Sequence, residues 1–237
     1  DGSNCEAIDC TNSTSDYCQD LSVLQEFIDN SQGGINPPPS NLHPLNLGEQ
    51  IWKYGRLQSL CVSKYCPNIS YKLSGQIPTS IGNLKFLDEL NLESNMLTGE
   101  IPSEIGNLVF LTSINLHGNY LTGNIPSEIG NLISLEHFEI GSNYITGEIP
   151  PEIGNLLYLR WFGMYNCDLT GEIPPEIGNL VFLEHLDLTL NQISGEIPSE
   201  LENLTQLQSL FLNDNNITGE IPSSIGNLTK LVHFELL

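Results

Sequence analysis

The chain has 237 residues, with 29 Asp or Glu against 7 Lys or Arg, so its formal net charge is -22. Such an acidic chain is poorly suited to nucleic acid or an anionic membrane, and it favours cationic partners or metal ions. No apolar run reaches the roughly 18 residues that a membrane-spanning helix needs.

Cysteines cluster at the N-terminal end, where residues 1–56 show no regular repeat. Every cysteine except Cys167 lies at or before Cys66, and their number is odd, so one of them is free or bonded outside this chain. We expect two bridges here, one between Cys61 and Cys66 and one among Cys5, Cys10 and Cys18. This clustering is typical of a disulfide-stapled cap in an oxidising compartment, so we expect a secreted or cell-surface protein.

A short helix is predicted inside this cap. Asp20 can cap it, Gly33 and Gly34 can stop it, and its apolar residues fall on one face, namely Leu21, Leu24, Phe27 and Ile28. After a proline-rich connector at residues 36–40, the segment 51–62 approximates a first strand of the repeats. An insertion at residues 63–72 then delays the repeat frame.

From residue 73 onward the same sequence frame recurs at a fixed period. A glycine stands two residues before each Ile-Pro pair, at Gly75, Gly99, Gly123, Gly147, Gly171, Gly195 and Gly219. The frame between these glycines reads L-x-x-L-x-L-x-x-N, and this motif at such a period is the mark of a leucine-rich repeat solenoid. We expect an array over residues 57–237, with an irregular first repeat at 57–80 and an incomplete last one.

Each repeat predicts the same local structure. The L-x-x-L-x-L segment should be a short parallel strand, because leucines at alternating positions point inward. The Pro-x-x-Ile-Gly-Asn-Leu run is too short and too rich in glycine for an α-helix, so 3-10 turns are expected on the convex side. The Asn of the frame can satisfy backbone groups. Cys167 occupies this Asn position, so we expect a buried, reduced thiol and not a nucleophile.

The consensus L-x-x-L-x-L-x-x-N-x-L-T-G-x-I-P-x-x-I-G-N-L closely resembles the plant-type leucine-rich repeat of receptor-like proteins, receptor kinase ectodomains and polygalacturonase inhibitors. The resemblance covers the regular array, residues 73–237. It implies an α/β solenoid with a parallel sheet on its concave face, a second strand at T-G-x-I-P, a superhelical twist and a concave binding face. The cap departs from the family pattern, because Trp52 is followed by Lys-Tyr-Gly and its cysteines come later.

The outward positions of the predicted strands differ between repeats, whereas the convex Ile-Pro-x-Glu-Ile-Gly-Asn-Leu stretch is almost copied. Variation on one face of a copied array is what a binding face would show. Trp161, Tyr165 and Phe211 lie on this face beside Gly141 and Gly163, an arrangement of anchors and hollows that is typical of interface hot spots. The alternative is that these rings only cover the sheet.

Histidines on the same face are followed two residues later by carboxylates, as in His137 with Glu139 and His185 with Asp187. Each pair could form half of a metal site. However, the two histidines are two repeats apart, about 10 Å at strand spacing, with Trp161 between them. We therefore expect no metal site and no enzyme. The candidate ligand-binding residues are Trp161, Tyr165, Phe211, His137, His185, Glu139, Asp187 and Arg160.

Glutamates recur in two columns, one of which contains Glu100, Glu148, Glu172, Glu196 and Glu220. Stacked carboxylates about 5 Å apart repel one another. We expect no cofactor and a solvated surface here, and the alternative is calcium bound diffusely by these columns. The candidate glycosylation sites are Asn12 and Asn68, because the repeat frame does not require their sequons.

The sequence ends on a predicted strand at residues 231–237 without a polar capping segment. A bare strand edge invites pairing, so we expect either a fragment of a longer protein or an edge covered by another molecule. The main functional prediction is an extracellular, non-enzymatic recognition module that binds a protein, peptide or glycan on its concave face. The alternative is a structural protein that forms filaments or a surface layer by head-to-tail packing on a neighbouring cap.

Overall fold

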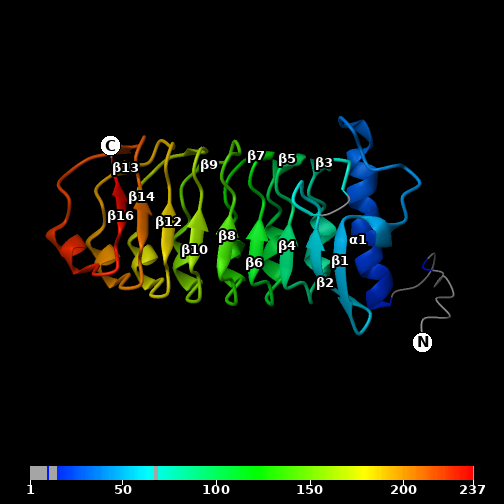
Figure 1. Ribbon diagram of the computed structural model, residues 1–237, viewed down its shortest axis with the longest axis horizontal. Coiled ribbons are helices and arrows are strands. Elements are labelled where there is room, and N and C mark those ends of the chain that lie inside the picture. The colour runs from blue at the N-terminus through cyan, green and yellow to red at the C-terminus, as the bar shows by residue number, and fades with distance from the viewer. Residues whose placement is uncertain (1–9, 11–14, 67–68, 237) are drawn as a thin grey trace.

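The computed structural model describes residues 10, 15–66 and 69–236. Within this part the chain forms an elongated solenoid with one helix, α1 (Asp16–Asn30), across one end and successive repeats stacked in a row beyond it (Figure 1). Cys5, Asn12 and Asn68 lie outside the described residues. No helix in the described part of the chain is both long enough and apolar enough to cross a bilayer.

The concave face is a sheet with one strand from each repeat. Its order follows the chain, with β1 (Glu49–Lys53) antiparallel to β2 (Arg56–Cys61) and all later strands parallel. These later strands are β4 (Glu89–Asn91), β6 (Ser113–Asn115), β8 (His137–Glu139), β10 (Trp161–Gly163), β12 (His185–Asp187), β14 (Ser209–Phe211) and β16 (His233–Glu235). The parallel sheet predicted from the repeat frame is confirmed.

Within the repeats, a second short strand follows the strand of the concave sheet. One group contains β3 (Ser74–Gln76), β5 (Met96–Glu100) and β7 (Tyr120–Thr122), and two pairs join β9 (Thr146–Gly147) to β11 (Asp168–Leu169) and β13 (Ser194–Gly195) to β15 (Asn216–Ile217). The second strand at T-G-x-I-P, which the family resemblance implies, is therefore present.

Short 3-10 helices lie on the convex side, as predicted. They span Thr79–Asn83, Ser103–Asn107, Ser127–Asn131, Pro151–Asn155, Pro175–Asn179, Ser199–Asn203 and Ser223–Asn227, and two more lie in the cap at Ser31–Gly33 and Pro44–Asn46. Each convex helix starts after a proline, because the fixed φ of proline suits the residue before the turn. The leucines and isoleucines of strands and turns together form one continuous buried core along the solenoid.

Asparagines join each repeat to its neighbour. The Nδ2 of Asn143 donates to the carbonyls of Ile140 (2.8 Å) and Leu116 (3.1 Å), and its Oδ1 accepts from the N–H of Leu121 (2.9 Å). Backbone groups of two repeats are thus satisfied by one buried amide. Cys167 occupies the same position with a buried, unbridged thiol, and burial raises its pKa to about 11. This confirms the prediction of a reduced structural cysteine.

The cap differs from its predicted structure in two ways. Helix α1 begins at Asp16, with Ser15 as its N-cap, and not at Asp20. Asp20 is fully buried because its carboxylate binds the guanidinium of Arg56 (two contacts of 2.9 Å) and the N–H of Leu57 (2.9 Å). The carboxylate of Asp20, which was expected to cap the helix, therefore binds Arg56 instead.

The predicted first strand at residues 51–62 is in fact a hairpin of β1 and β2. Its turn places Tyr54 (φ 51°) and Gly55 (φ 74°) in the left-handed region, as a tight hairpin turn requires. The strand β2 then pairs with β4, so the hairpin attaches the cap directly to the repeat sheet. The two predicted bridges are confirmed as Cys10 with Cys18 and Cys61 with Cys66.

Candidate binding face

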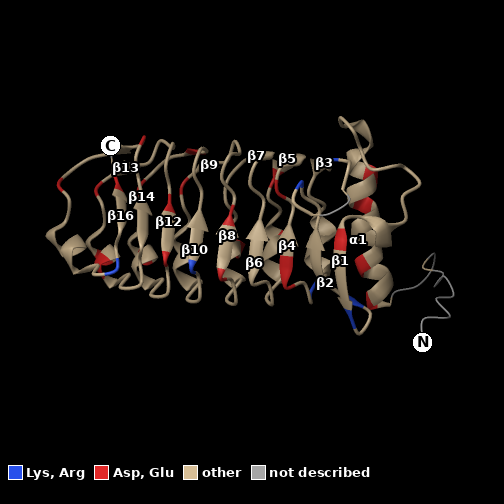
Figure 2. Cartoon of the chain, in the orientation of Figure 1, with Lys and Arg blue, Asp and Glu red and all other residues tan. Residues whose placement is uncertain are grey.

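Acidic residues are distributed from α1 to the last repeats, whereas basic residues are few (Figure 2). On the concave sheet, Arg160 is held between Glu136 (3.5 Å) and Glu184 (2.8 Å) of the adjacent repeats. Its charge is thereby matched within the sheet. We infer that the remaining concave surface has an excess of carboxylates.

Trp161 lies at the centre of a row of aromatic rings on this sheet. It is paired in register with His137 of β8 on one side and His185 of β12 on the other. The ring centroids of Trp161 and His137 are 5.7 Å apart, and those of Trp161 and His185 are 4.8 Å apart. The indole therefore separates the two histidines, as the repeat spacing predicted. Among the described residues, no group of three or more His, Cys, Asp or Glu could hold a metal ion.

Glu139 is a buried carboxylate next to this tryptophan. Only 6% of the residue is exposed, and its Oε2 accepts from the indole N–H of Trp161 (2.9 Å) while its Oε1 accepts from the N–H of Gly141 (3.0 Å). Burial raises the pKa of Glu139, and these two hydrogen bonds oppose that effect only in part. Within the described ranges, Glu139 forms no ion pair with Lys or Arg.

The two concave glycines are not hollows, contrary to the prediction. A Cβ at Gly163 would collide with the carboxylate of Glu139, and a Cβ at Gly141 would lie 2.9 Å from Cε1 of Tyr165. The space at each glycine is therefore filled by a longer side chain from an adjacent repeat. Glycine is needed at these positions because the side chain of Glu139 packs against the backbone of Gly163 and that of Tyr165 packs against the backbone of Gly141.

The open space lies instead toward the cap side of Trp161. A shallow hollow of about 300 Å³ is lined by Tyr65, Glu93, Asn115, His117, His137, Glu139, Trp161 and Tyr165. The hydroxyl of Tyr165 lies 3.1 Å from Nδ1 of His117, and Asn115 donates to the carboxylate of Glu93 (3.1 Å). We call this space the concave hollow.

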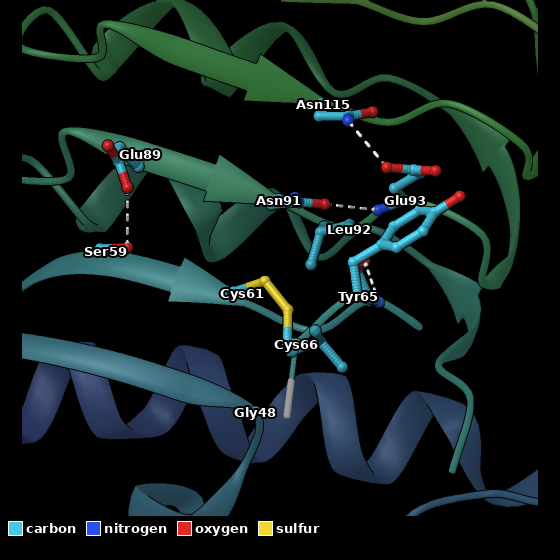
Figure 3. Close-up of a disulfide and its surroundings, with 12 residues drawn as sticks. Gly48, Ser59, Cys61, Tyr65, Cys66, Glu89, Asn91, Leu92, Glu93 and Asn115 are labelled. Atoms are coloured by element: carbon cyan, nitrogen blue, oxygen red, sulfur yellow. Dashed lines mark hydrogen bonds between the residues drawn. A yellow bond between two sulfur atoms is a disulfide. The ribbon is translucent and has the colours of Figure 1, made fainter. Parts of the chain in front are cut away.

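Tyr65 comes from the insertion that delays the repeat frame, not from a repeat strand. The bridge between Cys61 and Cys66 closes this loop, and the N–H of Tyr65 donates to Oγ of Ser63 (3.1 Å). Figure 3 shows the ring of Tyr65 beside Glu93, with Asn115 on the next strand. The ammonium of Lys64 lies 4.7 Å from the centroid of the Tyr65 ring.

The structure divides the predicted site residues into two groups. His137, Glu139, Trp161 and Tyr165 line the concave hollow, whereas the other four lie outside it, namely Arg160, His185, Asp187 and Phe211. The prediction omitted Tyr65, Glu93, Asn115 and His117. Three of these omitted residues, namely Glu93, Asn115 and His117, are outward positions of the predicted strands. The aromatic residue between Cys61 and Cys66 was the available signal for the fourth, Tyr65.

His137 provides a prediction about pH. Its Nδ1 is buried and has no hydrogen-bond partner among the described residues, and burial lowers the pKa of this histidine. The unfolded chain therefore binds more protons than the folded chain as pH falls below about 6.5, so this residue makes the fold less stable in acid. Replacement His137→Phe keeps a ring against Trp161 but cannot titrate. We therefore expect the difference in unfolding free energy, variant minus original chain, to increase as the pH falls from 7.5 to 5.5.

Urea denaturation at several pH values measures this difference. Because acid also neutralises carboxylates throughout the chain, only the difference between the two proteins is informative. A difference that stays constant over this range would show that protonation of His137 is not coupled to folding.

Two family models match the sequence. One, described as a leucine-rich repeat region, covers residues 148–237, and the other, described as a leucine-rich repeat, covers residues 86–108, 110–132 and 134–156. No curated protein matches the sequence.

Similar solved structures include three plant receptors. The plant peptide hormone receptor RGFR1 in complex with RGF2 is 40% identical, with a TM-score of 0.70 over 75% of this chain and 27% of the receptor chain. The complex of PEPR1 with AtPEP1 is 28% identical, with a TM-score of 0.81 over 92% of this chain and 31% of the other. The Arabidopsis receptor kinase HAESA, in complex with the peptide hormone IDA and the co-receptor SERK1, is 35% identical, with a TM-score of 0.67 over 73% and 33%. This chain thus spans about a quarter to a third of the receptor chains that it matches.

Proposed function

Because the chain belongs to the leucine-rich repeat family, with repeats like those of plant receptor ectodomains, we propose that it is an extracellular, non-enzymatic recognition module. Its ligand is a peptide or a protein, bound on the concave sheet. The similar receptors RGFR1 and HAESA were solved in complex with RGF2 and with the peptide hormone IDA, which supports this class of partner. The two disulfides agree with an oxidising compartment.

The observation that carries this proposal is the position of the concave hollow, which lies on the face where the side chains differ between repeats. On the convex side, the 3-10 helix Ser103–Asn107 has the same sequence as Ser127–Asn131, and Pro151–Asn155 is identical to Pro175–Asn179. The concave strands of those same repeats read Ser-Ile-Asn, His-Phe-Glu, Trp-Phe-Gly and His-Leu-Asp. If side chains served only packing, the sequence should vary between repeats to the same degree on both faces. A binding face, in contrast, needs different side chains in different repeats.

Trp161 is the residue that we expect to dominate binding. The residue is 37% exposed and lines the concave hollow, and tryptophan is enriched among interface residues whose loss costs about 2 kcal/mol or more. Peptides selected from a random display library on the folded chain should therefore bind Trp161→Ala at least about 30-fold more weakly. Affinity is measured by calorimetry or fluorescence anisotropy with the synthetic peptides.

Tyr158→Ala is the matched control for this experiment. Tyr158 belongs to the same repeat and is more exposed, but it lies outside the concave hollow and stacks on Phe182. Peptides that bind both variants equally well would contradict the proposal. Because the indole of Trp161 also donates to Glu139, circular dichroism must first show that the variant is folded.

Head-to-tail self-assembly into filaments stays a prediction from the sequence.

A further inference from the structure

We propose that the concave hollow is a subsite for one basic side chain of the ligand, with a guanidinium preferred over an ammonium. This inference rests on the proposed recognition function and specifies the chemistry of the bound residue. It follows from three features of the hollow, namely its unmatched carboxylates, its aromatic walls and its size.

The first feature is charge. Glu93 and Glu139 line the hollow, and of the described residues that line it none is Lys or Arg. Arg56 is bound to Asp16 and Asp20 in the cap, and Arg160 is bound to carboxylates of the two adjacent repeats. Glu139 thus holds a buried carboxylate with neutral donors only, an arrangement that opposes folding unless a cation joins it.

The carboxylate of Glu139 can accept further hydrogen bonds. Each of its two oxygens accepts one described hydrogen bond, whereas a carboxylate oxygen can accept about two. A planar guanidinium can donate to both oxygens of one carboxylate at once, which a lysine ammonium cannot do with the same geometry. This favours arginine in the ligand.

The second feature is the aromatic lining. Tyr65, Trp161 and Tyr165 contribute rings to the hollow, and a guanidinium stacks well on such faces. The ring of Tyr65 already contacts one cation, because the ammonium of Lys64 lies over its face. Lys64 is exposed and does not line the hollow.

The third feature is size and rigidity. A volume of about 300 Å³ is at the lower limit for small-molecule pockets, which suits a single side chain and not a whole ligand. The wall formed by Tyr65 is held by the loop that the Cys61 to Cys66 bridge closes (Figure 3). A wall fixed before binding reduces the entropy lost when the ligand enters.

The test uses N-acetyl-arginine amide and its neutral isostere N-acetyl-citrulline amide. Trp161 reports on the hollow through the indole N–H resonance of ¹⁵N-labelled protein, and Trp52→Phe identifies this resonance, since the chain has two tryptophans. We expect saturable shifts of the Trp161 resonance with the arginine compound at millimolar concentration, and none with citrulline. Equal shifts with both compounds, or no shift with either up to about 50 mM, far above a Kd of about 1 mM, overturn the subsite.

Variants locate the bound cation. Glu139→Gln should weaken arginine binding about tenfold, the effect expected for a charge-assisted pair, and Tyr65→Ala should weaken it severalfold. Glu89→Gln is the matched control, because Glu89 is an exposed carboxylate on the same sheet that does not line the hollow. Equal affinity of the Glu139 and Glu89 variants for arginine would also overturn the proposal.

The library-selected peptides separate this inference from the function on which it rests. If peptides need Trp161 but tolerate replacement of every basic residue by a neutral one, recognition stands and the basic subsite is wrong. If arginine amide binds as expected while no selected peptide needs Trp161, the subsite stands and the concave recognition function is wrong.

Discussion

Replacing Asp20 with alanine is expected to lower the free energy of unfolding by about 3–5 kcal/mol, the largest effect of any single substitution considered for this chain. The carboxylate is fully buried and binds the guanidinium of Arg56 and the N–H of Leu57. Its removal leaves Arg56, which is only 8% exposed, without its main counter-charge. Urea denaturation followed by circular dichroism measures the loss.

Asp16→Ala provides the control for this prediction. Asp16 contacts the same guanidinium at 3.1 Å, but its side chain is 68% exposed. Solvent screens such a pair, so the expected loss is below about 1 kcal/mol. Losses of similar size in the two variants would mean that burial of the Asp20 pair does not stabilise the cap.

Asn143→Ala is expected to lower the free energy of unfolding by about 2–4 kcal/mol. The substitution removes four hydrogen bonds, two of which reach the preceding repeat at Leu116 and Leu121. Buried backbone groups that lose their partners cost about 1–3 kcal/mol each, and relaxation around the smaller residue recovers part of that sum. In a solenoid, the loss also weakens the coupling between the two halves of the array.

The comparison with Asn215→Ala tests this explanation. Asn215 makes the same four kinds of bond, to Ile193, Leu188, Leu212 and Asn213, but it is only partly buried. Water can replace its amide, so the loss should be smaller by at least about 1 kcal/mol. Urea midpoints and hydrogen exchange of the adjacent repeats report both effects, and equal losses at the two positions would rule out burial as the cause.

The repeat frame predicted most of the fold because a fixed period also fixes the register. Once one leucine points inward, its equivalents in every other repeat must do the same, which placed the strands, the 3-10 helices and the buried Cys167. The cap has no such frame. Ser15 is a local signal for the start of α1 and Gly55 is a local signal for the hairpin turn, but no repeat singles them out among the other serines and glycines of the cap. The pairing of Asp20 with Arg56, far along the chain, has no local signature in the sequence.

The binding face was predicted as a surface but not as a site. Position within the repeat was enough to place Trp161, Tyr165, His137 and Glu139 on the concave sheet. It could not show that Glu139 folds over Gly163, because that direction depends on the neighbouring strand. Tyr65 was missed because it belongs to an insertion whose path the period does not constrain.

The contact of Glu139 with Gly163 restricts how this array can evolve. Gain or loss of a whole repeat preserves the core, because every repeat offers its neighbours the same buried side chains. A repeat inserted between β8 and β10, however, would place a new residue beside Glu139, and any β-carbon there would displace the carboxylate. Repeat number can therefore change beyond the repeat of β10 without altering the residues that line the concave hollow, whereas a repeat inserted between β4 and β10 would separate them.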